Sequence, residues 1–237
     1  MTYAFDFGDI GNNAGLLAHG MGITLGLTAA STALGGLVGT AGALTAIAGP
    51  RWARATVSAY VELIRNTPFL VQLFFVFFGL PSLGIHIDEM QAAVLAMAVN
   101  VGAYAIEIVR AGIESVPSGQ QQAARAIGLS GPQVFIHVVL PQALANVYPA
   151  VVGQVLIMML GSAVVSQISV QDLTYAANYI QSRDFRSFET YIVVTLIYLL
   201  LAIGLRWLLN RLGARLFAGR APRSAGRVHA SAATESV

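Results

Sequence analysis

Long runs of apolar residues alternate with short polar stretches along this chain, and their lengths predict membrane spans. A helix needs about 20 predominantly apolar residues to cross the hydrocarbon core of a bilayer. Five segments satisfy this requirement, at about 20–48, 55–80, 90–109, 147–168 and 190–209. The pattern therefore predicts an all-α membrane protein with about five transmembrane helices.

Two of these segments carry further local signals. The first is dense in Gly, Ala, Ser and Thr, and small residues let helix backbones approach closely, so we expect it to pack against protein on at least one face. In the second, Pro68 predicts a kink near Thr67. Glu62 and Arg65 lie about one helical turn apart in that segment, and we expect them to neutralise each other.

Composition supports the membrane class and excludes several others. Only 10% of the 237 residues are charged, whereas a soluble domain carries about 25%, and the mean hydropathy is +0.70. All thirteen basic residues are Arg, and there is no Lys or Cys. The chain therefore lacks a lysine-containing phosphate loop and any thiolate nucleophile or metal ligand. The four His residues are too scattered for a metal site, and no catalytic cluster is evident, so no enzyme activity is expected.

The distribution of arginine predicts how the chain is oriented, because cytoplasmic loops carry an excess of basic residues. Ten arginines flank one set of span ends and two flank the other, with Arg65 uncounted inside a span. We therefore place residues 1–15 outside the cell and the C-terminus in the cytoplasm. Residues 216–237 contain few bulky apolar side chains, which predicts a disordered cytoplasmic tail. The basic pI of about 9.2 reflects this topology rather than nucleic-acid binding.

Residues 110–146 form the largest cytoplasmic loop in this topology. We expect a short amphipathic helix at about 118–127, ended by Gly128 in the left-handed conformation, and a second helix capped by Ser130. Pro141 should break that helix before the fourth span. Two interpretations remain open: an amphipathic hairpin lying at the membrane interface, or a helix presented to a groove on a cytoplasmic protein.

The stretch QQAARAIGLSGPQVFIHVVLP at 121–141 resembles the EAA loop of permease subunits from ATP-binding-cassette (ABC) importers. Ala123, Ala124, Gly128 and the pair Leu140–Pro141 match that pattern, whereas Gln122 replaces its leading acidic residue. YVELIRNTPFLVQLFFVFFGLP at 60–81 and VGAYAIEIVRAGIESVPSGQQQAARAIGLS at 101–130 resemble the polar amino acid branch, which includes histidine, arginine and glutamine uptake systems. The resemblance covers roughly residues 15–215.

The resemblance implies a type I ABC importer permease domain at 16–215 in a bacterial inner membrane. It also implies a nucleotide-binding subunit that holds ATP and magnesium, a second permease subunit, and an extracytoplasmic amino-acid-binding protein, with no cofactor in this chain. The ATPase-docking residues would be Gln122, Ala123, Ala124, Arg125, Gly128 and Leu129. An ion-gradient-driven secondary transporter of small polar solutes is the alternative function.

The polar residues within the third and fourth spans are candidates for the translocation path. They are Asn100, Tyr104, Gln154 and Ser162. Hydrogen bonding between helices is the competing interpretation, and we expect Glu107 to pair with Arg110. Many members of the resembled family carry a K-D-T-S-like tetrapeptide late in the fourth span, where this chain has residues 160–163, LGSA. Because intramembrane charges are usually functional, their absence suggests a partner permease subunit that is not identical.

Overall fold

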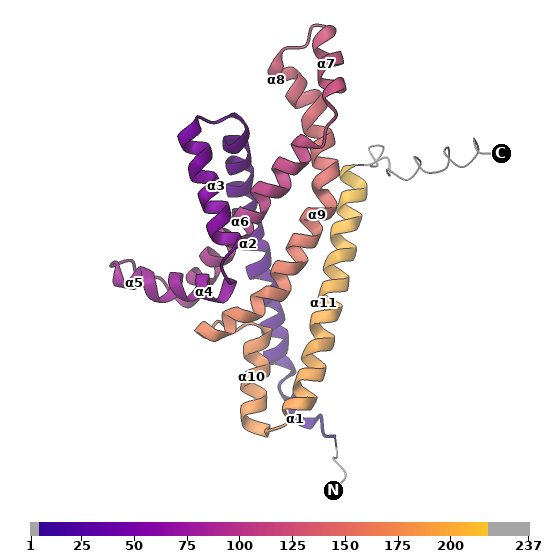
Figure 1. Cartoon of the computed structure of the whole chain (residues 1–237). Coiled ribbons are helices and arrows are strands. Elements are labelled where there is room, and N and C mark those ends of the chain that lie inside the picture. The colour runs from indigo at the N-terminus through magenta and orange to yellow at the C-terminus, as the bar shows by residue number, and fades with distance from the viewer. Residues whose placement is uncertain (1–4, 218–237) are drawn as a thin grey trace, which may run out of the picture.

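The computed structural model describes residues 5–217, which form an elongated bundle of helices (Figure 1). The first half comprises α1 (Gly8–Asn12), α2 (Ala14–Ala48), α3 (Arg51–Arg65), α4 (Phe69–Phe74), the π-helical turn η1 (Phe75–Gly79), α5 (Leu80–Ser82) and α6 (Glu89–Glu114). The second half comprises α7 (Ser118–Ala126), α8 (Gly131–Val134), the π-helical turn η2 (Phe135–Val139), α9 (Leu140–Gly161), the 3-10 segment η3 (Ser162–Ile168), α10 (Leu173–Asp184) and α11 (Ser187–Leu216). Between residues 5 and 217, four helices are long and apolar enough to span a membrane, or five if the bent pair of α3 with α4–α5 counts as one span.

Helices α2 and α6 form the centre of the bundle, and glycine makes their close packing possible. A Cβ atom built on Gly35 would lie 2.6 Å from Val101 Cβ, and one on Gly39 would overlap the Cβ atom of Ala105. The buried residues of α2 recur every three or four positions, so one face of the helix contacts protein. This confirms the close packing predicted for the first span.

The second predicted span is broken rather than kinked. Helix α3 ends at Arg65, and Pro68 precedes α4. The chain bends by 109° between these two helical parts. Pro68 lacks an N–H group and disfavours a helical conformation in the preceding residue, so the position of the break was predicted correctly. The expectation of a mere kink was wrong, because α4 and α5 turn away from α3 and extend to the side of the bundle (Figure 1).

The fourth span begins much earlier than predicted, because Pro141 does not break it. Residues 131–168 form one continuous helical segment, with Pro141 at the start of α9 directly after η2. A π-helical turn widens the backbone locally, which makes room for the proline ring near the preceding turn. The same arrangement recurs at η1, which ends two residues before Pro81. The predicted break at Pro141 was therefore wrong.

Helix α10 was not predicted from the sequence. It is held against α2 by a hydrogen bond and close packing, at the end of the bundle away from α7. The Asp172 side chain is fully buried and accepts a hydrogen bond from Tyr175 N at 2.8 Å. Leu173 N donates to Thr24 Oγ1 at 3.3 Å, and a Cβ on Gly20 would lie 2.8 Å from the Asp172 carbonyl oxygen. Burial raises the pKa of the Asp172 carboxyl to about 6.

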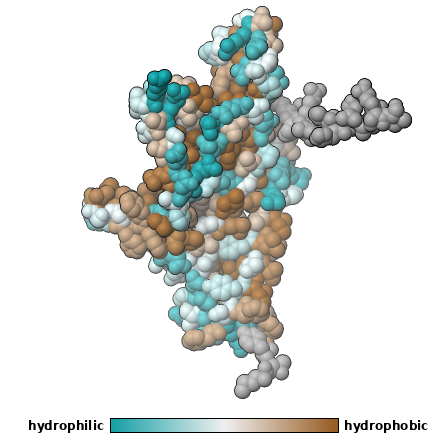
Figure 2. Space-filling view, in the orientation of Figure 1, coloured by the Kyte–Doolittle hydropathy of each residue, from teal (hydrophilic) through white to brown (hydrophobic). Residues whose placement is uncertain are grey.

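Hydrophilic side chains gather on α3 and on the α7–α8 end, whereas hydrophobic ones cover α4, α5 and much of α11 (Figure 2). Helix α1 and the C-terminal end of α11 lie at opposite ends of the bundle (Figure 1). Which end faces the cytoplasm stays a prediction from the arginine distribution. Most of the predicted tail, from residue 218 onward, lies outside the described residues, and so do residues 1–4 of the predicted extracytoplasmic segment.

Candidate functional site

The α7–α8 hairpin (residues 118–139) projects beyond the rest of the bundle (Figure 1), and its turn is closed by backbone hydrogen bonds. Gly128 has a φ of +90°, as predicted, and its N–H donates to Arg125 O at 2.9 Å. Leu129 N donates to Ala124 O at 3.2 Å. These two bonds form a Schellman motif, which satisfies the last carbonyl groups of α7 and reverses the chain without a long loop.

The hairpin shares a small apolar core with the residues that flank it on either side. Ala124 is buried there with Val116, Val134, Val139 and Ala143. Of the predicted docking residues, Gln122, Ala123, Arg125 and Gly128 are exposed and Leu129 is partly buried. Ala124 therefore positions the hairpin from within, while the others form its outer surface.

One exposed residue at the turn was missed by the sequence interpretation. Ile127 is 80% exposed although it is large and apolar. Its place at the C-cap of α7, directly before Gly128, is the local signal that could have revealed it, because a residue at such a turn points away from both helices. Ile127 adds an apolar side chain to the outer surface of the hairpin.

The hairpin is tied to the spans by polar side chains. Gln142 Nε2 on α9 donates to Gln120 Oε1 on α7 at 2.6 Å, which joins the hairpin to α9. Asn146 Nδ2 on α9 donates to Ser115 Oγ at 3.0 Å, which joins α9 to the end of α6. Ser130 N donates to Gln133 Oε1 at 2.8 Å, which holds the first turn of α8 as expected of a cap. A displacement of the hairpin would therefore be transmitted directly to α6 and α9.

The four candidate path residues fall into different environments. Asn100 is buried and donates through Nδ2 to Gln72 Oε1 at 2.9 Å. Tyr104 lines a cavity and lies under the guanidinium of Arg65, whose Cζ is 5.3 Å from the ring centroid. Gln154 is half-buried. Ser162 is fully buried and donates to Met159 O at 2.7 Å, so its hydroxyl turns into its own helix.

Gln72 was not predicted as important, yet it holds the broken span together. Its Nε2 atom donates to Ile64 O at 2.7 Å, Thr67 O at 3.1 Å and Thr67 Oγ1 at 2.8 Å. Because a break inside a membrane frees carbonyl groups that lipid cannot satisfy, these bonds stabilise the bend between α3 and α4. The bond from Asn100 then fixes the bend to α6, so Asn100 acts as a structural anchor.

Gln72→Leu should lower the free energy of unfolding by about 1–3 kcal/mol, because the buried Asn100 amide and the half-buried Thr67 carbonyl lose the hydrogen bonds that Gln72 makes to them. The measurement is the midpoint of thermal unfolding in detergent. Gln154→Leu is the matched control, since it makes the same substitution in another span at a half-buried side chain. Equal midpoints for the two variants would contradict this account of the bend.

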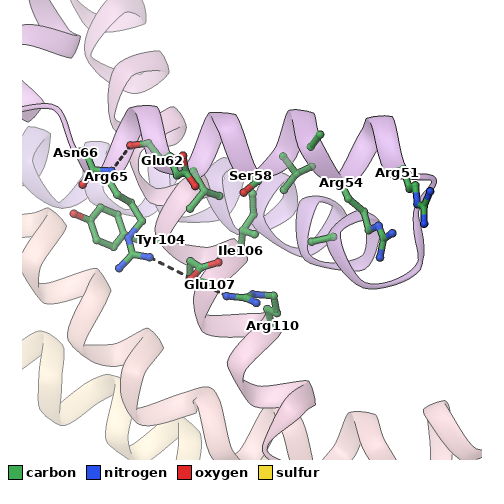
Figure 3. A pocket seen from close by; sticks show the side chains of 14 residues that line it. Arg51, Arg54, Ser58, Glu62, Arg65, Asn66, Tyr104, Ile106, Glu107 and Arg110 are labelled. Carbon is green, nitrogen blue, oxygen red and sulfur yellow. Dashed lines mark hydrogen bonds and ion pairs between the residues drawn. The ribbon is translucent and has the colours of Figure 1, made fainter.

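The charged residues near the α3–α6 contact pair differently from the sequence expectation. Arg65 Nη1 lies 3.3 Å from Glu107 Oε2, and Arg110 Nη2 lies 3.1 Å from the same oxygen (Figure 3). The predicted pair of Glu107 with Arg110 is therefore confirmed. The predicted mutual neutralisation of Glu62 and Arg65 was wrong, because the fold brings Glu107 within reach of Arg65.

This architecture of membrane-spanning helices with a projecting helical hairpin defines a class of transport permease. The chain matches the model of the binding-protein-dependent transport system inner membrane component over residues 22–218. It belongs to that family, whose members are transport permeases rather than enzymes.

Relatives and solved structures agree with this assignment. The chain is 40% identical over 159 residues to the probable glutamine ABC transporter permease protein GlnM of Bacillus subtilis (strain 168), covering 67% of this chain and 74% of that protein. It is 31% identical over 214 residues to the glutamine transport system permease protein GlnP of Escherichia coli (strain K12), covering 90% and 98%.

Among solved structures, an amino acid ABC transporter with histidines superposes with a TM-score of 0.84 at 37% identity, covering 90% of this chain and all of that chain. The MetNI methionine ABC transporter shares the fold, with a TM-score of 0.72 at 22% identity over 85% of this chain and 96% of that chain. The resemblance to amino acid ABC importer permeases and the predicted type I fold are both confirmed.

Proposed function

We propose that this chain is the membrane-spanning permease subunit of an ATP-driven amino acid uptake system. It forms the translocation path with a second permease subunit and couples to a separate ATPase subunit, which binds ATP and magnesium, through residues 118–141. An extracytoplasmic binding protein delivers the amino acid. The relatives named for glutamine transport and the 37% identical amino acid transporter support the substrate class.

The observation that carries the coupling role is the construction of the α7–α8 hairpin. Its outer surface offers Gln122, Ala123, Arg125 and Ile127, which suits a helix seated in a groove of another protein. Its closed turn and the bond between Gln120 and Gln142 make it a rigid lever on α9, which the bond between Asn146 and Ser115 joins to the end of α6. A hairpin that only rested on the membrane interface would not need this stiffness.

Docking is tested by purifying the tagged chain with its co-expressed ATPase subunit. Ile127→Glu should remove the ATPase subunit from the purified complex, because it places a charge in an apolar contact. Ile85→Glu is the matched control, since Ile85 is also exposed, at 51%, but lies in the link between α5 and α6. Retention of the ATPase subunit by Ile127→Glu, or its loss from both variants, contradicts the docking role.

The alternative of a secondary transporter driven by an ion gradient makes a different prediction for reconstituted vesicles. An ABC permease with its partners takes up radiolabelled amino acid only when ATP and the binding protein are supplied. Uptake by the chain alone, driven by a proton or sodium gradient, would establish the alternative. Competition by a panel of unlabelled amino acids then identifies the substrate.

The second permease subunit is proposed to be non-identical. In this chain the late part of the fourth span carries no charge at residues 160–163, and the Ser162 hydroxyl is turned into its own helix. A site that uses charged groups there would need them from the partner. Intact-mass measurement of the purified complex decides the question: two different permease masses support the proposal, and two copies of this chain overturn it.

A further inference from the structure

A cavity of about 810 Å³ lies between the end of α2, helix α3 and the second half of α6 (Figure 3). Neither the proposed docking role nor the candidate path accounts for its charges. The ionisable side chains that line it, apart from Tyr104, are Arg51, Arg54, Glu62, Arg65, Glu107 and Arg110. With four arginines and two glutamates, the lining carries a net positive formal charge.

One end of the cavity is internally neutralised. Glu107 contacts both Arg65 and Arg110, and Arg110 also reaches Glu114 at 3.5 Å. Arg65 is further held by the ring of Tyr104. These groups form a neutral network, so the charges that the lining leaves unbalanced are those of Glu62, Arg51 and Arg54, which sum to one positive charge.

The other end of the cavity carries two arginines that lie outside this network. Arg51 and Arg54 lie on the first turn of α3 (Figure 3), and neither forms an ion pair with any residue between 5 and 217. The N-cap residue Pro50 makes no side-chain hydrogen bond to the helix. The free N–H groups of a helix N-terminus add partial positive charge, so this end attracts anions.

Apolar side chains flank the same turn. Trp52, next to Arg51, is 74% exposed, and Leu44 and Ile47 on the last turns of α2 are 44% and 41% exposed. Tryptophan is enriched where the bilayer meets water, and exposed aliphatic residues suit acyl chains. A ligand with an anionic head and apolar tails would satisfy both sets of residues, whereas a free soluble anion would use only the arginines.

We propose that this cavity binds the phosphate headgroup of an anionic phospholipid. Arg51 and Arg54 contact the phosphate, for which the planar guanidinium group is well suited, and the acyl chains run along Trp52, Leu44 and Ile47. Basic pockets between membrane helices recognise lipid headgroups in this way. The proposal does not depend on the coupling role of the hairpin, because the cavity is lined by residues of α2, α3 and α6 and by none of α7 or α8.

The test is native mass spectrometry of the purified complex titrated with phosphatidylglycerol or, separately, with phosphatidylcholine. The wild type should bind phosphatidylglycerol preferentially, and the double variant Arg51→Gln with Arg54→Gln should bind it roughly 30-fold more weakly, given the usual contribution of a basic residue near a membrane surface. Arg51→Lys with Arg54→Lys, which keeps both charges, should retain most of the binding.

The control is Arg183→Gln with Arg206→Gln, which removes the same charge from exposed positions on α10 and α11. This control variant should bind phosphatidylglycerol as tightly as the wild type. Equal losses in both glutamine variants would show only a general surface charge effect and would overturn the proposal. Equal binding of the two lipids would also overturn it, as would displacement of phosphatidylglycerol by millimolar inorganic phosphate, which would assign the cavity to a soluble anion.

Discussion

Gly128→Val should abolish ATP-driven amino acid uptake while leaving the transmembrane bundle folded. The φ of +90° at Gly128 is a conformation that glycine adopts freely, whereas an L-residue pays at least about 1–2 kcal/mol there and a β-branched one more. The turn would relax and lose the bonds that Gly128 N and Leu129 N make to the end of α7. Because nothing lies within 4 Å of a Cβ at this position, the defect would come from backbone strain and not from a clash.

Two variants separate the conformational cause from other effects. Gly119→Val places the same side chain on α7, in open space and at a glycine without positive φ, so transport should continue. Gly128→Asn should recover part of the activity, because asparagine tolerates the left-handed conformation. The measurements are radiolabelled amino acid uptake and ATP hydrolysis by the reconstituted complex. Wild-type uptake by Gly128→Val would refute the lever role of the hairpin.

The hairpin was predictable from sequence because its signals are local. The helix predicted at about 118–127 is observed at Ser118–Ala126, Gly128 adopts the predicted left-handed conformation, and Ser130 begins the second helix. Each feature depends on a few neighbouring residues. Pro141 shows the limit of such rules, since a proline that follows a π-helical turn is accommodated within a continuous helix.

The side-chain network inside the membrane was not predictable, because it depends on contacts between distant segments. Gln72 is a single amide in an apolar run, and its importance follows from the 109° bend and from Asn100, which is 28 positions away. Arg65 has Glu62 within one turn, but the fold offers it Glu107 from α6 instead. The hydrogen bond from Leu173 N to Thr24 Oγ1 likewise joins residues 149 positions apart.

The central contact between α2 and α6 leads to the second large effect. Gly39→Leu should prevent stable folding of the chain, because even the first atom of a side chain would overlap Ala105 and approach its backbone to about 3.1 Å. Two long helices would have to separate along their whole contact, so the cost should reach or exceed the upper end of the roughly 1–3 kcal/mol typical of overpacking. The measurement is the yield and thermal midpoint of monodisperse protein in detergent.

Gly36 provides the matched comparison on the same helix. A Cβ at Gly36 would meet nothing within 4 Å, although the residue is half-buried, so Gly36→Leu should keep the wild-type midpoint. Gly36→Leu and Gly39→Leu make the same substitution on the same helix within one turn of each other, and they differ in the neighbour that the new side chain meets.

A milder pair of variants tests the cause directly. Gly39→Ala should lower the thermal midpoint, and adding Ala105→Gly should restore most of it, because the second change removes the Cβ atom that the first one overlaps. If the double variant were as unstable as the sum of its parts, the α2–α6 contact would not be limited by this overlap, and another cause would have to explain why glycine lies at position 39.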